Sequence, residues 1–125
     1  MYSLIDTHAH LYLAEFELDR TSMLERAKQA GIEKIFLPAI DSSTHTSLLQ
    51  METDFSWCKA MMGVHPCSIN ENYQEELAIA QQYWDKRSFV AVGEIGLDFY
   101  WDRTFEKQQY EAFRIQIEWA LAKNV

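Results

Sequence analysis

The sequence predicts an α/β fold of parallel strands and covering helices, forming one domain over residues 1–125 without an internal boundary. The first observation behind this prediction is that an apolar, β-rich segment followed by a helical pattern occurs four times. The second is that no linker separates these units. Four βα units are half the number in an eight-stranded TIM-type barrel of about 250 residues, so a partial barrel is expected.

Four short segments are predicted to form the strands because they are apolar and rich in β-branched or aromatic side chains. They run from Tyr2 to Asp6, from Glu33 to Ile40, from Trp57 to Val64 and from Ser88 to Glu94. The second segment contains Ile35-Phe36-Leu37 and is predicted to be buried on both faces. The third is followed closely by Pro66, which disfavours continuation of a strand.

Helical spacing of apolar residues predicts a helix after each strand. The expected ranges are Asp19 to Ala30, Asp41 or Ser42 to Asp54, Glu71 to Asp85, and Thr104 to Lys123. Gly31 is predicted to end the first helix, and Asp41 or Ser42 and then Asn70 to cap the next two. The expected packing faces of the last two helices are Tyr73, Leu77, Ala80 and Trp84 in one, and Tyr110, Phe113, Ile117, Ala120 and Leu121 in the other.

Composition limits the ligands that the protein can bind. The 19 acidic and 11 basic residues give a formal net charge of −8, which repels polyanions and argues against non-specific coating of nucleic acid. A substrate that carries phosphate therefore needs a local positive centre, and a bound divalent metal is one way to supply it.

The chain also lacks the patterns of membrane and exported proteins. No apolar run approaches the roughly 18 residues of a membrane span, and the start lacks the basic and apolar regions of a signal peptide. A cytoplasmic protein without a membrane partner is therefore expected. Cys58 and Cys67 are nine positions apart, which fits neither a redox CxxC motif nor a zinc knuckle, so both are expected to be free thiols.

The first cluster of candidate site residues, Asp6-Thr7-His8-Ala9-His10, directly follows the first predicted strand. Side chains alternate along an extended chain, so His8 and His10 point to the same side, and two neutral imidazoles there can chelate zinc or a similar ion. Asp6 shares that side and can orient an imidazole as a hydrogen-bond acceptor. A pair of histidines on an exposed turn is the alternative interpretation.

Glu94 lies at the carboxyl end of the fourth predicted strand, in Val92-Gly93-Glu94-Ile95-Gly96-Leu97-Asp98. The flanking glycines allow close backbone approach, and a carboxylate in this place can ligate or bridge metals, or act as a base. A glutamate that closes a loop by hydrogen bonding is the alternative. Asp98 lies further from the strand end and is interpreted as structural.

The two remaining histidines are interpreted differently. His65 lies at the end of the third predicted strand, in Gly63-Val64-His65-Pro66, where it can bind a substrate oxygen or donate a proton when charged. A core histidine held by one hydrogen bond is the competing interpretation. His45 lies within a predicted helix among serine and threonine residues, and it is expected at the surface.

Three adjacent aromatic residues, Phe99, Tyr100 and Trp101, precede Arg103 in the loop after Glu94. Such rings can stack on nucleobases with Arg103 near a phosphate, or they can fill the gap between loop and helix. Three polar clusters thus follow three strands at the end where α/β proteins build their sites. The chain contains no Walker loop, dinucleotide fingerprint or nucleophile elbow.

Four motifs occur together along the chain: Asp6-Thr7-His8-Ala9-His10-Leu11, Gly63-Val64-His65-Pro66, Val92-Gly93-Glu94-Ile95-Gly96-Leu97-Asp98, and Gln109, Phe113, Gln116 and Ala120 along the last helix. In order and spacing they resemble the TatD family of metal-dependent DNases and hydrolases, within the amidohydrolase-like superfamily. The resemblance covers essentially the whole chain and about the amino-terminal half of a typical member.

The resemblance implies a TIM-type barrel and a DNase that uses one or two divalent ions, Mg²⁺ or Zn²⁺, on DNA or a nucleotide substrate. It implies that His8, His10 and Glu94 bind metal, that Glu94 and His65 are catalytic, and that His65 lies near the substrate phosphate. A metal-activated water would attack phosphorus. Family members take further histidines and a late aspartate from later strands, so a chain that is part of a longer enzyme is expected.

Two other functions fit the same residues. A metallohydrolase of a small amide, lactone or phosphoester substrate can use the same histidine pair, because fold and ligands do not choose the substrate. A naturally short chain would instead be a non-catalytic protein that binds a metal or a partner.

Overall fold

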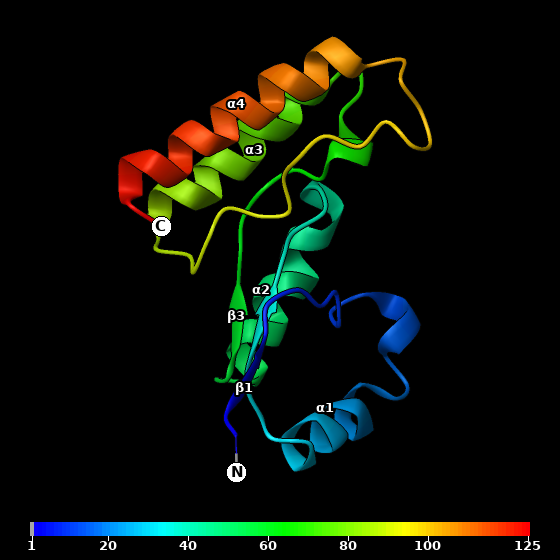
Figure 1. Cartoon of the computed structure of the whole chain (residues 1–125), viewed down its shortest axis with the longest axis vertical. Coiled ribbons are helices and arrows are strands. Elements are labelled where there is room, and N and C mark those ends of the chain that lie inside the picture. The colour runs from blue at the N-terminus through cyan, green and yellow to red at the C-terminus, as the bar shows by residue number, and fades with distance from the viewer. Residues whose placement is uncertain (1) are drawn as a thin grey trace.

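The computed structural model describes residues 2–125 and has the predicted parallel β/α arrangement (Figure 1). Strands β1 (Leu4–Asp6), β2 (Ile32–Leu37) and β3 (Cys58–Ala60) form one parallel sheet in the order β1-β2-β3. The helices are α1 (Arg20–Gln29), α2 (His45–Asp54), α3 (Tyr73–Lys86) and α4 (Glu106–Lys123), with 3-10 turns η1 (Ala14–Phe16), η2 (Ser42–Thr44) and η3 (Pro66–Ser68). Each strand therefore pairs with the next one along the chain.

The fourth predicted strand, Ser88 to Glu94, is wrong as a regular strand. This segment runs parallel to the continuation of β3, but its only ladder element is an isolated bridge between Met62 and Val92. The Val90 N–H donates to the Ala60 carbonyl at 3.3 Å, and the Gly93 N–H donates to the Met62 carbonyl at 3.0 Å. Within residues 2–125, the segment has a neighbouring strand on one side only. A segment at the edge of a sheet that also contains glycine forms a regular strand less readily.

Two of the predicted helix start and stop signals are confirmed, at Gly31 and Asp41, and the predicted cap at Asn70 is wrong. Gly31 ends α1 with a φ of 91°, a conformation that glycine adopts without strain. The Asp41 carboxylate accepts the Ser43 N–H at 3.0 Å and begins η2 just before α2. The Asn70 side chain accepts the Asn72 N–H at 2.8 Å in the turn before α3, and the helix begins at Tyr73, after Asn72, rather than at the predicted Glu71.

The core lies between the sheet and the helices that cover it. Its centre is formed by residues of β2, β3, α2 and the segment after β3 that are almost inaccessible to solvent: Ile35, Leu37, Leu48, Cys58, Ala60 and Met62. The prediction that the second strand is buried on both faces holds only for its last residues, because Glu33 and Lys34 are exposed. The first half of β2 thus lies at the rim of the core.

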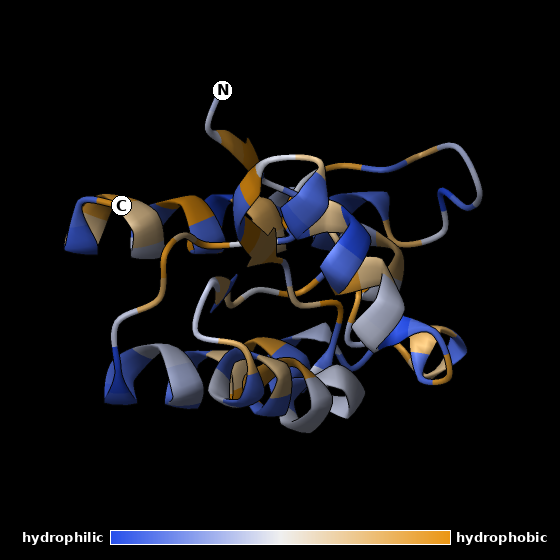
Figure 2. Ribbon diagram, turned by 90° about the horizontal axis from the view of Figure 1, so that it is seen from below, coloured by the Kyte–Doolittle hydropathy of each residue, from blue (hydrophilic) through white to orange (hydrophobic). Residues whose placement is uncertain are grey.

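The packing face of α3 was predicted correctly, and that of α4 was not. In α3 the predicted residues Tyr73, Leu77, Ala80 and Trp84 are buried. In α4 the buried residues are Gln109, Ala112, Gln116 and Trp119, whereas Leu121 is 74% exposed. Figure 2 shows hydrophobic segments on the outside of the fold, along β1 near the amino terminus and along α4 toward the carboxyl terminus.

Two further expectations from the sequence can be compared with the fold. Cys58, which is buried, and Cys67, which is exposed, are both free thiols, as predicted. Burial raises the pKa of the Cys58 thiol to about 11. No helix within residues 2–125 combines the length and the apolar character needed to cross a membrane.

His45 is buried rather than exposed, so its predicted surface position is wrong. The residue is 1% exposed at the first position of α2, and its ring meets Tyr83 edge-on at 4.9 Å between centroids. Neither ring nitrogen has a hydrogen-bond partner within residues 2–125. Burial lowers the pKa of His45, against the opposing charges of Glu76 and Asp41, so the folded chain holds this imidazole neutral.

Acid is therefore expected to destabilise the chain through His45. Below the unfolded pKa of about 6.5, the unfolded chain takes up a proton that the folded chain excludes, so the free energy of unfolding falls as pH falls. Urea unfolding between pH 7 and pH 5 should show a steeper loss in the wild type than in His45→Phe, which keeps a ring against Tyr83 but cannot titrate. Parallel pH profiles for the two proteins would contradict this assignment.

Candidate metal centre

Backbone hydrogen bonds between consecutive strand ends bring the candidate site residues together. The Ala9 N–H donates to the Phe36 carbonyl at 3.1 Å, which holds the segment after β1 beside β2. The Glu94 N–H donates to the Ala39 carbonyl at 3.0 Å, and the His65 N–H donates to the Ile40 carbonyl at 2.8 Å. The end of β2 and the segment that follows it are thus the shared support for the three predicted clusters.

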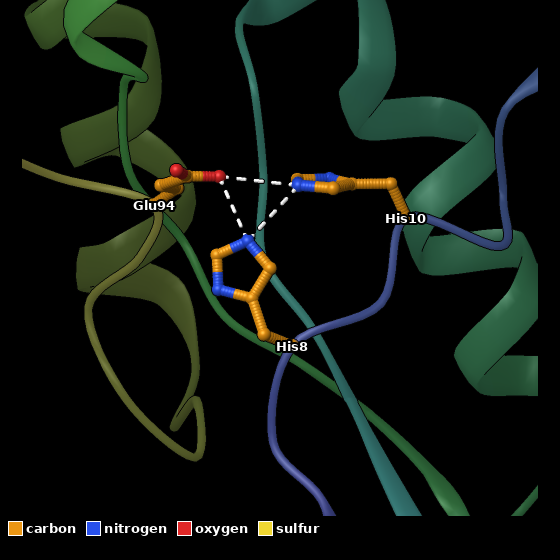
Figure 3. A group of neighbouring side chains, drawn as sticks. All are labelled: His8, His10 and Glu94. Carbon is orange, nitrogen blue, oxygen red and sulfur yellow. Dashed lines mark hydrogen bonds and ion pairs between the residues drawn. The ribbon is translucent and has the colours of Figure 1, made fainter. Parts of the chain in front are cut away.

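Three side chains converge at this edge of the sheet (Figure 3). Nε2 of His8 and Nε2 of His10 lie 3.0 Å and 3.1 Å from the same oxygen, Oε2 of Glu94. The two ring nitrogens lie 3.2 Å from each other. His8 is half-exposed, whereas His10 and Glu94 are mostly buried, so the cluster opens to solvent on the His8 side.

The geometry of these donor atoms fits a divalent metal ion. All three ligand atoms lie within 4.8 Å of one another. Ligands about 2.1 Å from one ion are separated by about 3.0–3.4 Å, which is the spacing observed here. Two imidazole lone pairs and a carboxylate oxygen repel one another when they face the same point, and a cation at that point removes the repulsion. Two nitrogens and one oxygen are also a donor set that Zn²⁺ accepts.

Tyr12 fixes the orientation of His10. The buried Tyr12 hydroxyl donates its proton to the Pro38 carbonyl at 2.5 Å, so it accepts from Nδ1 of His10 at 3.0 Å. Nδ1 therefore carries the ring proton of His10, and Nε2 presents a lone pair to the cluster. Burial lowers the pKa of His10, with the charge of Glu94 opposing, and this favours the neutral form that binds metal.

His65 is held in the opposite tautomer. Its Nδ1 accepts the Cys67 N–H at 3.0 Å, so the proton of the neutral ring is on Nε2. That nitrogen lies 3.3 Å from Oε1 of Glu94, the carboxylate oxygen turned away from His8 and His10. The ring thus presents a donor rather than a lone pair to the centre, and it is suited to bind an oxygen.

The two aspartates named from the sequence have structural contacts. The Asp6 carboxylate accepts the backbone N–H of His8 at 3.0 Å, so it bonds to the backbone rather than to an imidazole. Asp98 accepts the Tyr100 N–H at 2.9 Å, which agrees with its structural interpretation. The Gln109 side chain bonds both the N–H and the carbonyl of Asp98 at 2.9 Å and so fixes the start of the aromatic loop.

In the aromatic loop, residues 99–103, some side chains fill the gap between loop and helix, and others remain free to stack on a nucleobase. Phe99 packs against Tyr110 at 5.7 Å, and Arg103 lies over Phe99 and pairs with Glu106 at 2.9 Å. Arg103 is therefore engaged by α4, which opposes the expectation that it approaches a phosphate. Tyr100 and Trp101 remain 83% and 79% exposed.

Comparison with known proteins finds one family. The sequence model of TatD related DNase matches residues 5–125. The uncharacterized metal-dependent hydrolase YabD of Bacillus subtilis is 37% identical over 122 residues, covering 98% of this chain and 47% of the relative. The 3′-5′ ssDNA/RNA exonuclease TatD of Erwinia tasmaniensis is 30% identical over 125 residues, again covering 47% of the relative. The chain thus spans about half the length of the curated relatives that it matches.

Solved structures are similar over the same half. The TatD homologue YjjV from Escherichia coli superimposes with a TM-score of 0.82 at 35% identity, covering 94% of this chain and 46% of that one. A TatD family hydrolase from Entamoeba histolytica has the same fold, with a TM-score of 0.70 at 22% identity. With the family's sequence model matching nearly the whole chain, this protein belongs to the TatD-related DNase family.

Proposed function

We propose that His8, His10 and Glu94 bind one divalent cation, Zn²⁺ or Mg²⁺, in a hydrolase that cleaves phosphodiester bonds of DNA. The observation that carries the proposal is the convergence of three donor atoms within 4.8 Å, with His10 held by Tyr12 as a lone-pair donor. The imidazole pair favours Zn²⁺, because Mg²⁺ prefers oxygen ligands. A second ion would need donors beyond these three side chains.

The substrate proposal has separate support. Relatives in the family include one named as an exonuclease of single-stranded DNA and RNA. At a formal net charge of −8, the chain repels a polyanion on average, so a cation at the cluster is the expected attachment point for phosphate. The predicted cytoplasmic location and the single domain over residues 1–125 stay predictions.

Each residue of the centre has a proposed task. A divalent cation supplies Lewis acidity and lowers the pKa of water near it. His8 and His10 hold the cation with their Nε2 atoms, and Glu94 Oε2 completes the set that this chain provides. His65 donates from Nε2 to a non-bridging phosphate oxygen and holds phosphorus in place. The oxygen of water bonds to phosphorus as an ester P–O bond breaks, and the departing alkoxide takes up the proton that the water loses.

We also propose that the four parallel segments form the first part of a barrel. They follow one another in spatial order, as barrel strands do. Half-exposed Leu4 and Ile5 on β1, together with Leu121 on α4, are apolar surface of the kind that further βα units cover. Structural neighbours that are about twice as long support this arrangement.

Cleavage of end-labelled single-stranded DNA with added Zn²⁺ or Mg²⁺ tests the proposed activity. We expect shortening of the DNA that EDTA abolishes, and a rate at least about 100-fold lower in Glu94→Gln, because the carboxylate positions both metal and His65. Glu17→Gln, at an exposed glutamate outside the cluster, should retain the wild-type rate. Metal-loaded protein without EDTA-sensitive cleavage would refute the activity, and a parallel set of small esters and amides would reveal the alternative substrates.

A further inference from the structure

A pocket opens beside the candidate metal centre, between η3 and the aromatic loop that precedes α4. Its lining includes Cys67, Asp98, Trp101, Asp102 and Phe105. Two contacts connect it to the metal ligands: His65 lies 3.3 Å from Glu94, and the Cys67 N–H donates to His65 at 3.0 Å. Cys67 of the pocket lining therefore contacts His65, the residue that is proposed to hold phosphate.

Two exposed aromatic rings belong to the loop that lines this pocket. Tyr100 and Trp101 are 83% and 79% exposed, and their rings are perpendicular, with centroids 4.7 Å apart. Neither ring belongs to the core, whereas Phe99 of the same loop packs against α4. Of these two rings, Trp101 lines the pocket, so it can stack on a planar ligand that enters there.

The polar lining of the pocket accepts hydrogen bonds and repels anions. Oδ1 of Asp102 accepts the N–H and the hydroxyl of Thr104 at 2.9 Å and 2.6 Å, so Thr104 makes no use of Oδ2. Oδ2 of Asp98 accepts a hydrogen bond from the Cys67 thiol at 3.4 Å. Ionised carboxylates offer acceptors alone, so these oxygens select a ligand with N–H donors and disfavour a phosphate.

We propose that this pocket, formed by Asp98, Trp101 and Asp102, binds a nucleobase by its exocyclic amino group while the adjoining phosphodiester lies at Glu94. The proposal rests on the proposed function and adds a base preference to it. Cytosine and adenine present an amino donor where thymine presents a carbonyl acceptor. Two carboxylates therefore favour cytosine or adenine over thymine, and Trp101 stacks on the ring of either.

Binding of labelled phosphorothioate hexamers of oligo(dC) and oligo(dT) in the presence of Zn²⁺, measured by fluorescence anisotropy, tests this pocket. Oligo(dC) is expected to bind at least about fivefold more tightly than oligo(dT). Asp102→Asn keeps an oxygen for Thr104 and presents an amide N–H instead of the free oxygen, so it should remove or reverse that preference. Trp101→Ala should weaken both hexamers at least about fivefold. Tyr2→Ala removes an exposed ring at the opposite end of β1 and should change neither.

Equal affinity of the wild type for the two hexamers, or unchanged binding in both pocket variants, would overturn the base pocket. The hydrolase proposal has its own readout, EDTA-sensitive cleavage of bis(p-nitrophenyl) phosphate, which carries no base. A protein that cleaves this ester without discriminating between the hexamers retains the proposed function and loses the pocket. A protein that discriminates without cleaving retains the pocket and loses the function.

Discussion

Replacing His10 by alanine is expected to lower the affinity of the chain for Zn²⁺ by at least about 100-fold. His10 supplies one of three donor atoms, and the loss of a partner that merely orients a ligand already costs about 10–100-fold. Tyr12 also sets the tautomer of His10, so the substitution removes a lone pair that is already oriented toward the metal site. Isothermal titration with Zn²⁺ measures the change directly.

Two matched variants separate the loss of a ligand from a general effect on the fold. His45→Ala removes a histidine that is buried outside the cluster, and Glu17→Gln neutralises an exposed glutamate. Both should bind Zn²⁺ with wild-type affinity, whereas His8→Ala and Glu94→Gln should weaken it as His10→Ala does. Equal metal content in all five variants by elemental analysis would rule out the His8, His10 and Glu94 assignment.

Alternation and strand order explain how the sequence predicted this cluster. His8 and His10 are two positions apart after a strand, so an extended chain places both on one side, and the structure finds their Nε2 atoms 3.2 Å apart. Glu94 was placed at the same edge because parallel strands present their carboxyl ends together. The sequence did not reveal Tyr12 as the partner of His10, although it is two positions further along the same alternation.

The errors share a cause, which is that local patterns do not specify tertiary neighbours. His45 has serine and threonine around it in sequence, but the start of α2 is turned inward against Tyr83, so its ring is buried. The 88–94 segment has strand composition, but a regular ladder needs register with a neighbour, and only the Met62–Val92 bridge has it. Local composition predicts whether a segment forms a helix or a strand. The tertiary neighbours of the segment determine which side chains are buried and which strands pair.

In α4 the buried face is determined by loop backbone groups, at Asp98 and Val64, that need hydrogen-bond partners. Tyr110, Ile117 and Leu121 predict one face by hydrophobicity, yet that face is exposed. The opposite face carries Gln109, which bonds both backbone groups of Asp98, and Gln116, which does the same at Val64. Loop backbone at the end of a sheet lacks a ladder partner, and buried amide side chains meet that need.

Gln116→Leu is expected to destabilise the chain by about 2–3 kcal/mol, more than a surface substitution could. The Val64 N–H donates to Oε1 of Gln116 at 2.7 Å, and the amide nitrogen of Gln116 lies 3.4 Å from the Val64 carbonyl and 3.2 Å from that of Ala112. Leucine preserves the volume but removes every partner, so a buried N–H is left without an acceptor. Urea unfolding monitored by circular dichroism measures the loss.

The substitution should also act on the candidate site, because Val64 directly precedes His65. Gly63 confines Gln116 from the other side: a Cβ on Gly63 would lie 3.2 Å from Oε1 of Gln116 and 2.9 Å from the Gly93 carbonyl carbon. The segments that carry His65 and Glu94 therefore pack backbone to backbone around one amide. Gln82→Leu, on the exposed surface of α3, is the matched control and should change the free energy of unfolding by less than about 0.5 kcal/mol. Equal unfolding midpoints for Gln116→Leu and Gln82→Leu would show that the Val64 backbone finds another partner, and Gln116 would then have no part in holding His65 beside Glu94.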